Sequence, residues 1–365
     1  MKTVQKLFSV LILFISVICI GCSGDDHSDI RKAISAELDP LKGLNSSDAY
    51  SYLNQSTLFD DPSFSPESSS EEIMDVFSMF FKDFNYEIES VDLPEESTTA
   101  SASVRLTTID AESLARDFAA SSLRETVQNA AKNGGTETPA TTEERYLLLN
   151  HLLKTGIYDT VESDCDIRLT ETEDGWKVDH TAQLENQLVG GLISWLADPF
   201  ILTPENTLDI YLGTLHKMSQ EDLAKYLRIS SLANDADDAL SQIYSTIIAQ
   251  VHNNFDYEIL GSTVDGSTAE VRAAITTFDG NSVMKVYRAE MNTYLDSADA
   301  VIDGPDARLA YSRQLLLKHL KENTATVKND VTFLMENDGI SWKPVNTGNV
   351  FGNALFGTLL IDTEE

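Results

Sequence analysis

A five-residue stretch that occurs twice is the feature that most constrains how this chain can fold. Phe84-Asn85-Tyr86-Glu87-Ile88 returns, with one residue altered, as Phe255-Asp256-Tyr257-Glu258-Ile259. Further matches follow in the same order, and they pair residues 107–110 with 276–279, 147–152 with 315–320, and 174–177 with 338–343. Because chance matches would not keep one order, they indicate an internal repeat. We therefore expect a tandem duplication of one structural module.

Hydrophobic periodicity predicts the same series of elements in both copies. In the first copy, helices are expected at residues 28–38, from 47, at 70–84, 110–132, 143–155 and 184–197, and strands at 86–93, 97–109, 158–172 and 176–183. In the second copy, helices are expected from residues 204 and 219 and at 235–251, followed by a strand from 257. Strands that come as hairpins with helices grouped on one face predict an α+β fold.

The start of the chain has the pattern of an export signal. Lys2 and Lys6 precede an apolar run at residues 7–20, which is too short to span a bilayer comfortably. The run ends in Gly21-Cys22, and a small residue before cysteine at this point resembles the processing site of bacterial lipoproteins. The resemblance implies cleavage before Cys22 and a diacylglyceryl group on its sulfur, which anchors the chain to the outer face of the cytoplasmic membrane. An uncleaved anchor with the same topology is the alternative.

These features divide the chain into five predicted segments. They are a signal peptide at 1–21, a lipidated tether at 22–29, a first α+β domain at 30–197, a linker at 198–203 and a second domain at 204–362. The element order, with a tryptophan in the last hairpin of each copy (Trp176 and Trp342), resembles the cone-shaped nuclear transport factor 2-like fold. A cystatin-like sheet wrapped around one helix is the nearest alternative. A two-lobed transporter-type binding protein fits poorly, because it needs a parallel sheet.

The resemblance implies a pocket between the helices and the curved sheet, and some members of this fold are enzymes that use Asp, His or Tyr there. The candidate pocket residues are Tyr86, Asp110, His151, Tyr257, Asp279 and His319. Each also has a structural interpretation. The aspartates stand at strand-to-helix junctions, where Asp is a natural N-cap, the histidines lie in leucine-rich helices, and the tyrosines begin strands. No catalytic residue is assigned.

Charge excludes one class of partner. The chain has 59 acidic and 26 basic residues, a net charge of −33, and loss of Lys2 and Lys6 with the signal peptide takes it to −35. Such a field repels nucleic acid, so no nucleic-acid partner is expected. Arg105 and Arg272 are each expected to pair with a carboxylate across the sheet, and a bound anion is the alternative.

Metal and cofactor chemistry find little support in the sequence. The six histidines are scattered without metal-ligand spacing, and neighbouring acids make a thiolate at Cys165 unfavourable. We expect no cofactor and no metal, with weak calcium binding by the aspartate-rich loop 296–306 as an alternative. The chain is therefore predicted to be a lipid-anchored, extracytoplasmic, non-catalytic binding module for a small molecule, a peptide or an envelope protein. An enzyme inside one or both cones and a structural spacer remain as alternatives.

Overall fold

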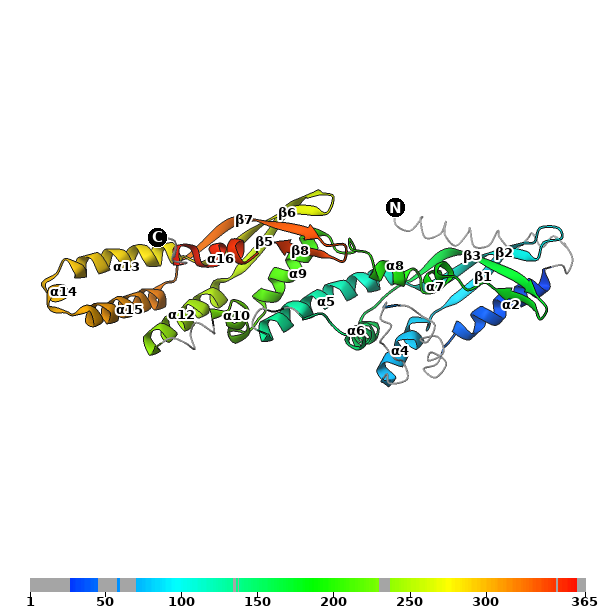
Figure 1. The fold of residues 1–365 in the computed structure, drawn as a ribbon, viewed down its shortest axis with the longest axis horizontal. Helices are drawn as coiled ribbons and strands as arrows, with labels where there is room; N and C mark the ends of the chain where they lie inside the picture. Colours follow the sequence, from blue (N-terminus) through cyan, green and yellow to red (C-terminus); the bar gives the residue numbers. More distant parts are fainter. Residues whose placement is uncertain are drawn as a thin grey trace, which may run out of the picture.

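The molecule is elongated, with two modules end to end (Figure 1). The computed structural model describes residues 27–44, 58–59, 70–133, 136, 138–229, 237–345 and 347–359. Each module contains one four-stranded antiparallel sheet with helices against it, so the α+β class is confirmed and the two modules agree with the repeat. The signal peptide, Cys22, the helix expected from residue 47 and most of the following loop lie outside the described residues.

Both modules use the same order of elements. The first contains α2 (Ser28–Leu38), η1 (Asp39–Leu41), α4 (Glu71–Phe80), β1 (Asn85–Asp92), β2 (Thr99–Ile109), α5 (Ala111–Lys132), α6 (Thr142–Thr155), β3 (Thr160–Thr172), β4 (Gly175–Val178), α7 (Ala182–Leu188) and α8 (Leu192–Leu196). The second contains α9 (Pro204–His216), α10 (Gln220–Tyr226), α12 (Asp238–Asn254), β5 (Asp256–Asp265), β6 (Thr268–Phe278), α13 (Gly280–Leu295), α14 (Ala298–Ile302), α15 (Pro305–Glu322), β7 (Thr326–Asn337), β8 (Trp342–Val345), α16 (Thr347–Phe356) and η3 (Gly357–Leu359).

The two sheets agree in strand order and in one irregularity. The strands run β1-β2-β3-β4 and β5-β6-β7-β8, each pairing antiparallel with its neighbour. A bulge falls between Ile88 and Ser90 in the first sheet and between Ile259 and Gly261 in the second. Bulges are specific features of a sheet, so the same bulge at the same place extends the repeat from sequence to backbone.

The repeated aromatic stretch joins a helix to the first strand in each module. Phe84 is buried with its ring edge-on to Phe81, at a centroid distance of 5.4 Å. Phe255 is likewise buried, stacked on Tyr257 and edge-on to Phe351 of α16. Large buried aromatic side chains dominate core energetics, which explains why this stretch is the clearest trace of the duplication.

Three predicted boundaries in the first module were wrong. Helix α4 ends at Phe80, and strand β4 ends at Val178 because Thr181 already begins α7 by accepting a hydrogen bond from the Leu184 amide at 3.1 Å. The closing helix is two helices, α7 and α8, since Gly190 and Gly191 take φ values of 62° and 82°. Left-handed backbone of this kind ends a helix and is open to glycine at little cost.

Helix α5 belongs to both hydrophobic cores. Leu114 and Phe118, in its first half, are buried in the core of the first module. Val127 and Ala131, in its second half, are buried in the core of the second module, where α5 contacts α9 and α10. Residues 111–132 therefore contribute to both cores. The linker predicted at 198–203 separates the two sheets, but part of the second core lies before it in the sequence.

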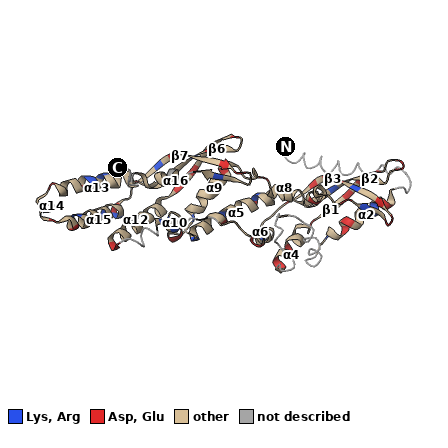
Figure 2. Cartoon of the chain, viewed as in Figure 1, with Lys and Arg blue, Asp and Glu red and all other residues tan. Residues whose placement is uncertain are grey.

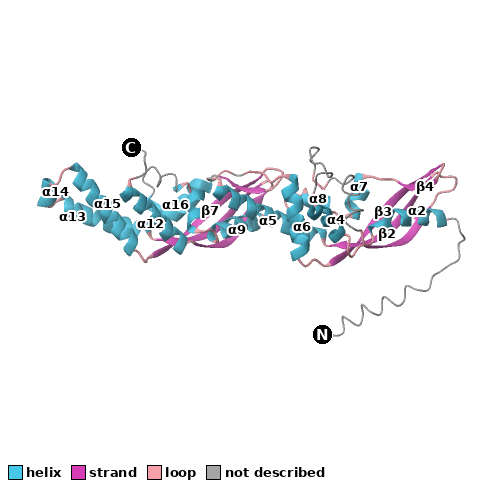
Figure 3. Ribbon diagram, turned by 90° about the horizontal axis from the view of Figure 1, so that it is seen from below, coloured by secondary structure: helices cyan, strands magenta, loops and turns pink. Residues whose placement is uncertain are grey.

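The counterpart of α5 in the second module, α13, ends differently. It stops at Leu295, and the chain turns through α14 and returns along α15. We call this unit, residues 280–322, the α13–α15 hairpin. It forms one end of the long molecule, and α2 lies near the other (Figures 1 and 3).

Charged residues of both signs are scattered along both modules (Figure 2). Among the helices of the described residues, none combines the length and the apolar character needed to cross a membrane.

Candidate functional site

The two candidate tyrosines make the same contact in both modules. The Tyr86 hydroxyl donates to Asp39 Oδ1 at 2.9 Å, and the Tyr257 hydroxyl donates to Asp209 Oδ1 at 2.9 Å. Burial, helped by the neighbouring carboxylate, raises the pKa of Tyr86 and raises that of Tyr257 to about 12. A tyrosine with a raised pKa keeps its proton at neutral pH. Tyr86 therefore ties η1 to β1, and Tyr257 ties α9 to β5.

The two candidate aspartates are N-caps, as their structural interpretation predicted. Asp110 Oδ1 accepts the Ser113 amide at 3.0 Å, and its Oδ2 accepts the Ser113 hydroxyl at 2.7 Å. Asp279 binds Ser282 in the same way, at 3.0 and 2.5 Å. Hydrogen bonds to the serine hydroxyl and then to the serine amide lower the pKa of both aspartates. Both carboxylates are thus occupied in starting α5 and α13.

The two candidate histidines occupy different environments. His151 is exposed on α6, whereas His319 is buried on α15. The His319 Nε2 atom lies 3.2 Å from Glu290 Oε2 on α13, a distance that forms an ion pair when the imidazole is protonated. Tyr86, Asp110 and His151 therefore have separate surroundings, and the contacts in the described residues do not bring them together as a catalytic group.

Two other sequence predictions can be compared with the structure. Arg105 forms ion pairs with Glu89 and with Asp164, the residue directly opposite on β3, as expected for a cross-strand pair. Arg272 is exposed and has no ion pair with a described residue. Cys165 is buried, and burial followed by the Asp166 charge raises its thiol pKa to about 11. A thiol with this pKa is a poor nucleophile at neutral pH.

Polar contacts hold the α13–α15 hairpin in one conformation. The Tyr294 hydroxyl donates to Asp303 Oδ2 at 2.5 Å, and its ring stacks on Tyr311 at a centroid distance of 4.0 Å. The Arg308 guanidinium donates twice to the Asp303 carbonyl, at 3.1 and 3.0 Å. Ser297 caps α14 by accepting the Ala300 amide. The aspartate-rich loop is therefore built around a short helix, which the sequence did not predict.

The α13–α15 hairpin also exposes apolar side chains. Of the thirteen large apolar residues exposed in the described part of the chain, six lie on it: Val286, Leu295, Val301, Ile302, Leu309 and Tyr311. Val301 and Ile302, at the turn, are 79% and 81% exposed. Scattered exposed apolar residues are ordinary, and their concentration on one projecting element makes this element a candidate interaction surface. This hairpin is the candidate functional site.

Four aspartates flank these apolar residues. Asp296, Asp299 and Asp303 lie between α13 and α15, and Asp306 lies in the first turn of α15, with Arg308 as the nearest basic residue in sequence. Across the described residues, no three His, Cys, Asp or Glu side chains are grouped so as to hold a metal ion. The surface at the turn is therefore apolar and acidic.

Comparison with known proteins does not place the chain in a family. No protein family and no curated protein matches it. A search of solved structures found the crystal structure of YcdA from Bacillus subtilis, described by name as a lipoprotein. The two chains share 12% identity over 72% of this chain and 92% of YcdA, with a TM-score of 0.24. A score this low does not establish a shared fold.

Proposed function

We propose that this chain is a lipid-anchored, extracytoplasmic surface protein that acts as a non-catalytic interaction module. The observation that carries the proposal is the α13–α15 hairpin, which projects at one end of the molecule with Val301 and Ile302 almost fully exposed. Such side chains lose contact with water when a partner covers them, and this burial is the main driving force of protein association. The cone-like shape expected from the fold resemblance stays a prediction.

The anchor is proposed from the sequence at Cys22. The lysines, the apolar run and Gly21-Cys22 have the order of a lipoprotein signal, and α2 begins only a few residues later. The hairpin lies far from α2 along the long axis of the molecule (Figure 3). A chain attached near α2 therefore presents the hairpin at a distance from its attachment point.

The chemistry of the hairpin selects the kind of partner. Asp296, Asp299 and Asp306 are exposed around the apolar turn, and opposite potentials across an interface favour association and suppress wrong partners. The whole chain carries a net charge of −33, which disfavours a second copy as the partner. We assign the surface to a protein of the envelope or its surroundings that presents apolar and basic side chains together.

A non-catalytic role is favoured over an enzyme by the candidate residues themselves. Tyr86 binds Asp39 of η1 and Tyr257 binds Asp209 of α9, whereas Asp110 and Asp279 cap helices. His151 is exposed and separate from these contacts. A general base must lie within hydrogen-bond reach of the group it serves. The tyrosines and the aspartates therefore supply contacts to the fold, and His319, 3.2 Å from Glu290, joins α15 to α13.

Site-specific photo-crosslinking on intact cells tests this function. A photoreactive amino acid at position 302 is expected to form one dominant adduct with another protein, less of it as ionic strength rises. Position 157 is the matched control, because Ile157 is 96% exposed in the first module. Identical adducts at both positions, or an adduct only with a second copy of the chain, would refute the assignment. Absence of any adduct at position 302 would favour the spacer alternative.

The anchor is tested separately by mass spectrometry of the N-terminal peptide from membranes. A diacylglyceryl group on Cys22 and the loss of residues 1–21 are expected. Recovery of an intact Met1 would contradict cleavage, and an unmodified Cys22 would contradict the anchor.

A further inference from the structure

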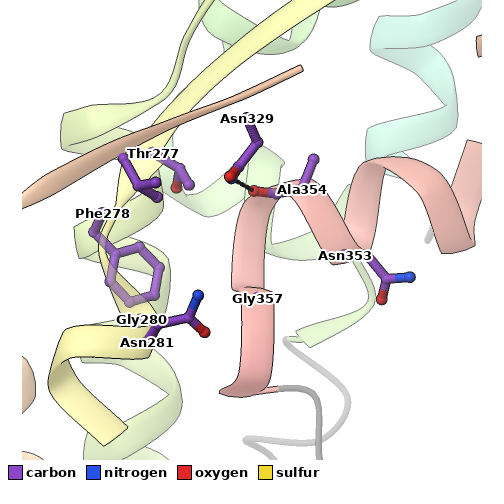
Figure 4. Close-up of a pocket in the computed structure, with 9 residues that line it drawn as sticks. Thr277, Phe278, Gly280, Asn281, Asn329, Asn353, Ala354 and Gly357 are labelled. Carbon is purple, nitrogen blue, oxygen red and sulfur yellow. Dashed lines mark hydrogen bonds between the residues drawn. The ribbon is translucent and has the colours of Figure 1, made fainter. Parts of the chain in front are cut away.

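A cavity of about 350 Å³ lies at one end of the second sheet, away from the hairpin turn. The end of β6, the start of α13, the first residues of β7 and the α16–η3 segment enclose it (Figure 4). Its size is at the lower end of the range of about 300–1,000 Å³ that is usual for small-molecule sites.

Three asparagines from three different elements line this cavity. They are Asn281 of α13, Asn329 of β7 and Asn353 of α16. The Asn329 Nδ2 donates to the Ala354 carbonyl at 3.0 Å, which orients its amide and leaves Oδ1 as an acceptor (Figure 4). Asn353 is exposed, and no described residue hydrogen-bonds to its side chain. A side-chain amide carries an NH₂ group that donates and an oxygen that accepts. The cavity therefore offers hydrogen-bond donors and hydrogen-bond acceptors.

Among the described residues, those that line the cavity carry no charge. None of its residues has a titratable side chain, although the chain contains 59 acidic and 26 basic residues. The nearby Asp279 carboxylate is bound to Ser282 as the N-cap of α13. An ionic ligand would therefore lose hydration without gaining a counter-charge, and a purely apolar ligand would make no hydrogen bond to the exposed Asn353 amide or to the Asn329 Oδ1 atom. The cavity suits a neutral ligand rich in hydrogen-bonding groups.

The first module lacks the counterparts of Asn281 and Asn329, which separates these two amides from the common scaffold. Counting from the matched caps Asp110 and Asp279, Glu112 stands where the second module has Asn281. Counting from the matched strand starts Thr160 and Thr326, Ser163 stands where it has Asn329. Features needed only for folding recur in both copies, as the caps and the tyrosine–aspartate pairs do. Asn281 and Asn329 are therefore not required by the shared fold.

We propose that this cavity binds one ring of a neutral carbohydrate. An amide can donate to one hydroxyl and accept from its neighbour, which matches the adjacent hydroxyls of a sugar. Val327, which is partly exposed in the lining, offers an apolar surface to the C–H groups of a sugar ring, and Phe278 is buried beneath the cavity wall. This inference goes beyond the interaction function proposed for the α13–α15 hairpin and depends on different residues.

Ligand-observed NMR and calorimetry on the full chain, held in a sugar-free detergent, test the proposal. The neutral probes are methyl α-glucopyranoside, methyl α-galactopyranoside and N-acetylglucosamine. Gluconate and glucosamine provide anionic and cationic comparisons, and N-acetylalanine methylamide provides a neutral ligand without hydroxyl groups. At least one neutral sugar is expected to bind more tightly than all three comparison compounds.

Variants locate the binding. Asn281→Ala and Asn353→Ala are each expected to weaken sugar binding about five- to tenfold, the change for one neutral hydrogen bond. Asn292→Ala removes an exposed asparagine of α13 outside the cavity and is expected to leave binding unchanged. Circular dichroism checks that all three variants are folded.

Three results would overturn the proposal. The first is no sugar binding at about 10 mM, the weak end of specific affinities. The second is equal sugar binding by the cavity variants and the wild type. The third is stronger binding of any comparison compound than of the neutral sugars. None of these results bears on crosslinking at position 302, so this site and the hairpin function can fail separately.

Discussion

Replacing Val127 with alanine should destabilise the second module, although the residue precedes that module in the sequence. Val127 lies in the second half of α5 and is 1% exposed, in the core formed with Leu208, Leu212 and Leu215 of α9. The substitution leaves the surface of both sheets unchanged. It therefore tests whether the second core extends into a helix of the first module.

The size of the effect follows from the buried methyl groups. Removing two of them costs about 1.6 kcal/mol in transfer free energy, at ~0.8 kcal/mol for each carbon. The remaining cavity adds about 1 kcal/mol, because core packing relaxes only partly. The better helix propensity of alanine returns about 0.5 kcal/mol. The net loss is about 2 kcal/mol, or roughly a thirtyfold rise in the population of the open state.

Hydrogen exchange followed by mass spectrometry measures this loss separately in each module. The amides of β6 and β7 are expected to lose protection by about thirtyfold, whereas those of β2 and β3 keep theirs. Gln128→Ala is the matched control, since Gln128 is the exposed neighbour on the same helix. Loss of protection in β2 and β3 with β6 and β7 unchanged would refute the assignment of Val127 to the second core.

Two further substitutions test the local contacts. Asp279→Ala should cost about 1 kcal/mol by removing the N-cap of α13. Because hydrogen bonds lower the folded-state pKa of Asp279, this contribution is present above the unfolded-state pKa and is lost as pH falls through the folded-state value. Thermal melts of the two proteins should converge in acid, and a constant gap at every pH would contradict the mechanism. Gly213→Ala should destabilise by about 1–3 kcal/mol, because a Cβ at Gly213 would lie 2.6 Å from the Tyr257 hydroxyl oxygen. Adding Tyr257→Phe removes this oxygen, so the double variant should lose less stability in urea than the two single changes combined, and additive losses would argue against the clash.

The local features of the fold were accessible from the sequence because they depend on neighbours in the chain. Asp110 and Asp279 cap helices whose third residue is only three positions away. Thr203 likewise accepts the Asn206 amide and places Pro204 at the first helical position, which is where the sequence predicted that a helix begins. Caps of this kind use short-range hydrogen bonds, and a duplicated sequence shows each of them twice.

Where local signals competed, the sequence prediction failed. The helix expected at residues 70–84 has Ser70 at its N-cap but ends at Phe80. The predicted strand through residue 183 overlooked Thr181, whose capping of α7 was a stronger local signal than the preceding alternation. Periodicity locates an element well, but its last turn depends on which cap forms.

The functional surfaces depended on tertiary structure. The candidates chosen from the sequence, such as Tyr86 and Asp279, are residues that the fold itself uses. The sequence around Ile302 does not distinguish it from an isoleucine of the core. Its exposure follows from the tertiary structure, in which α15 returns along α13 and Ile302 lies at the turn. Asn281 and Asn329 are far apart in the chain and meet at one cavity because the start of α13 lies beside the start of β7.

Repeats, caps and hydrophobic periodicity are encoded between near neighbours, so the chain alone specifies a duplicated α+β module with a lipoprotein-like signal. The different fates of α5 and α13 are a property of the folded molecule. Both helices begin in the same way at matched aspartates, yet α5 serves both cores and α13 turns back into a hairpin. The two helices differ after their first turn in what buries their side chains. Val127 and Ala131 of α5 pack against apolar residues of α9 and α10, whereas α13 packs against α15 of its own hairpin.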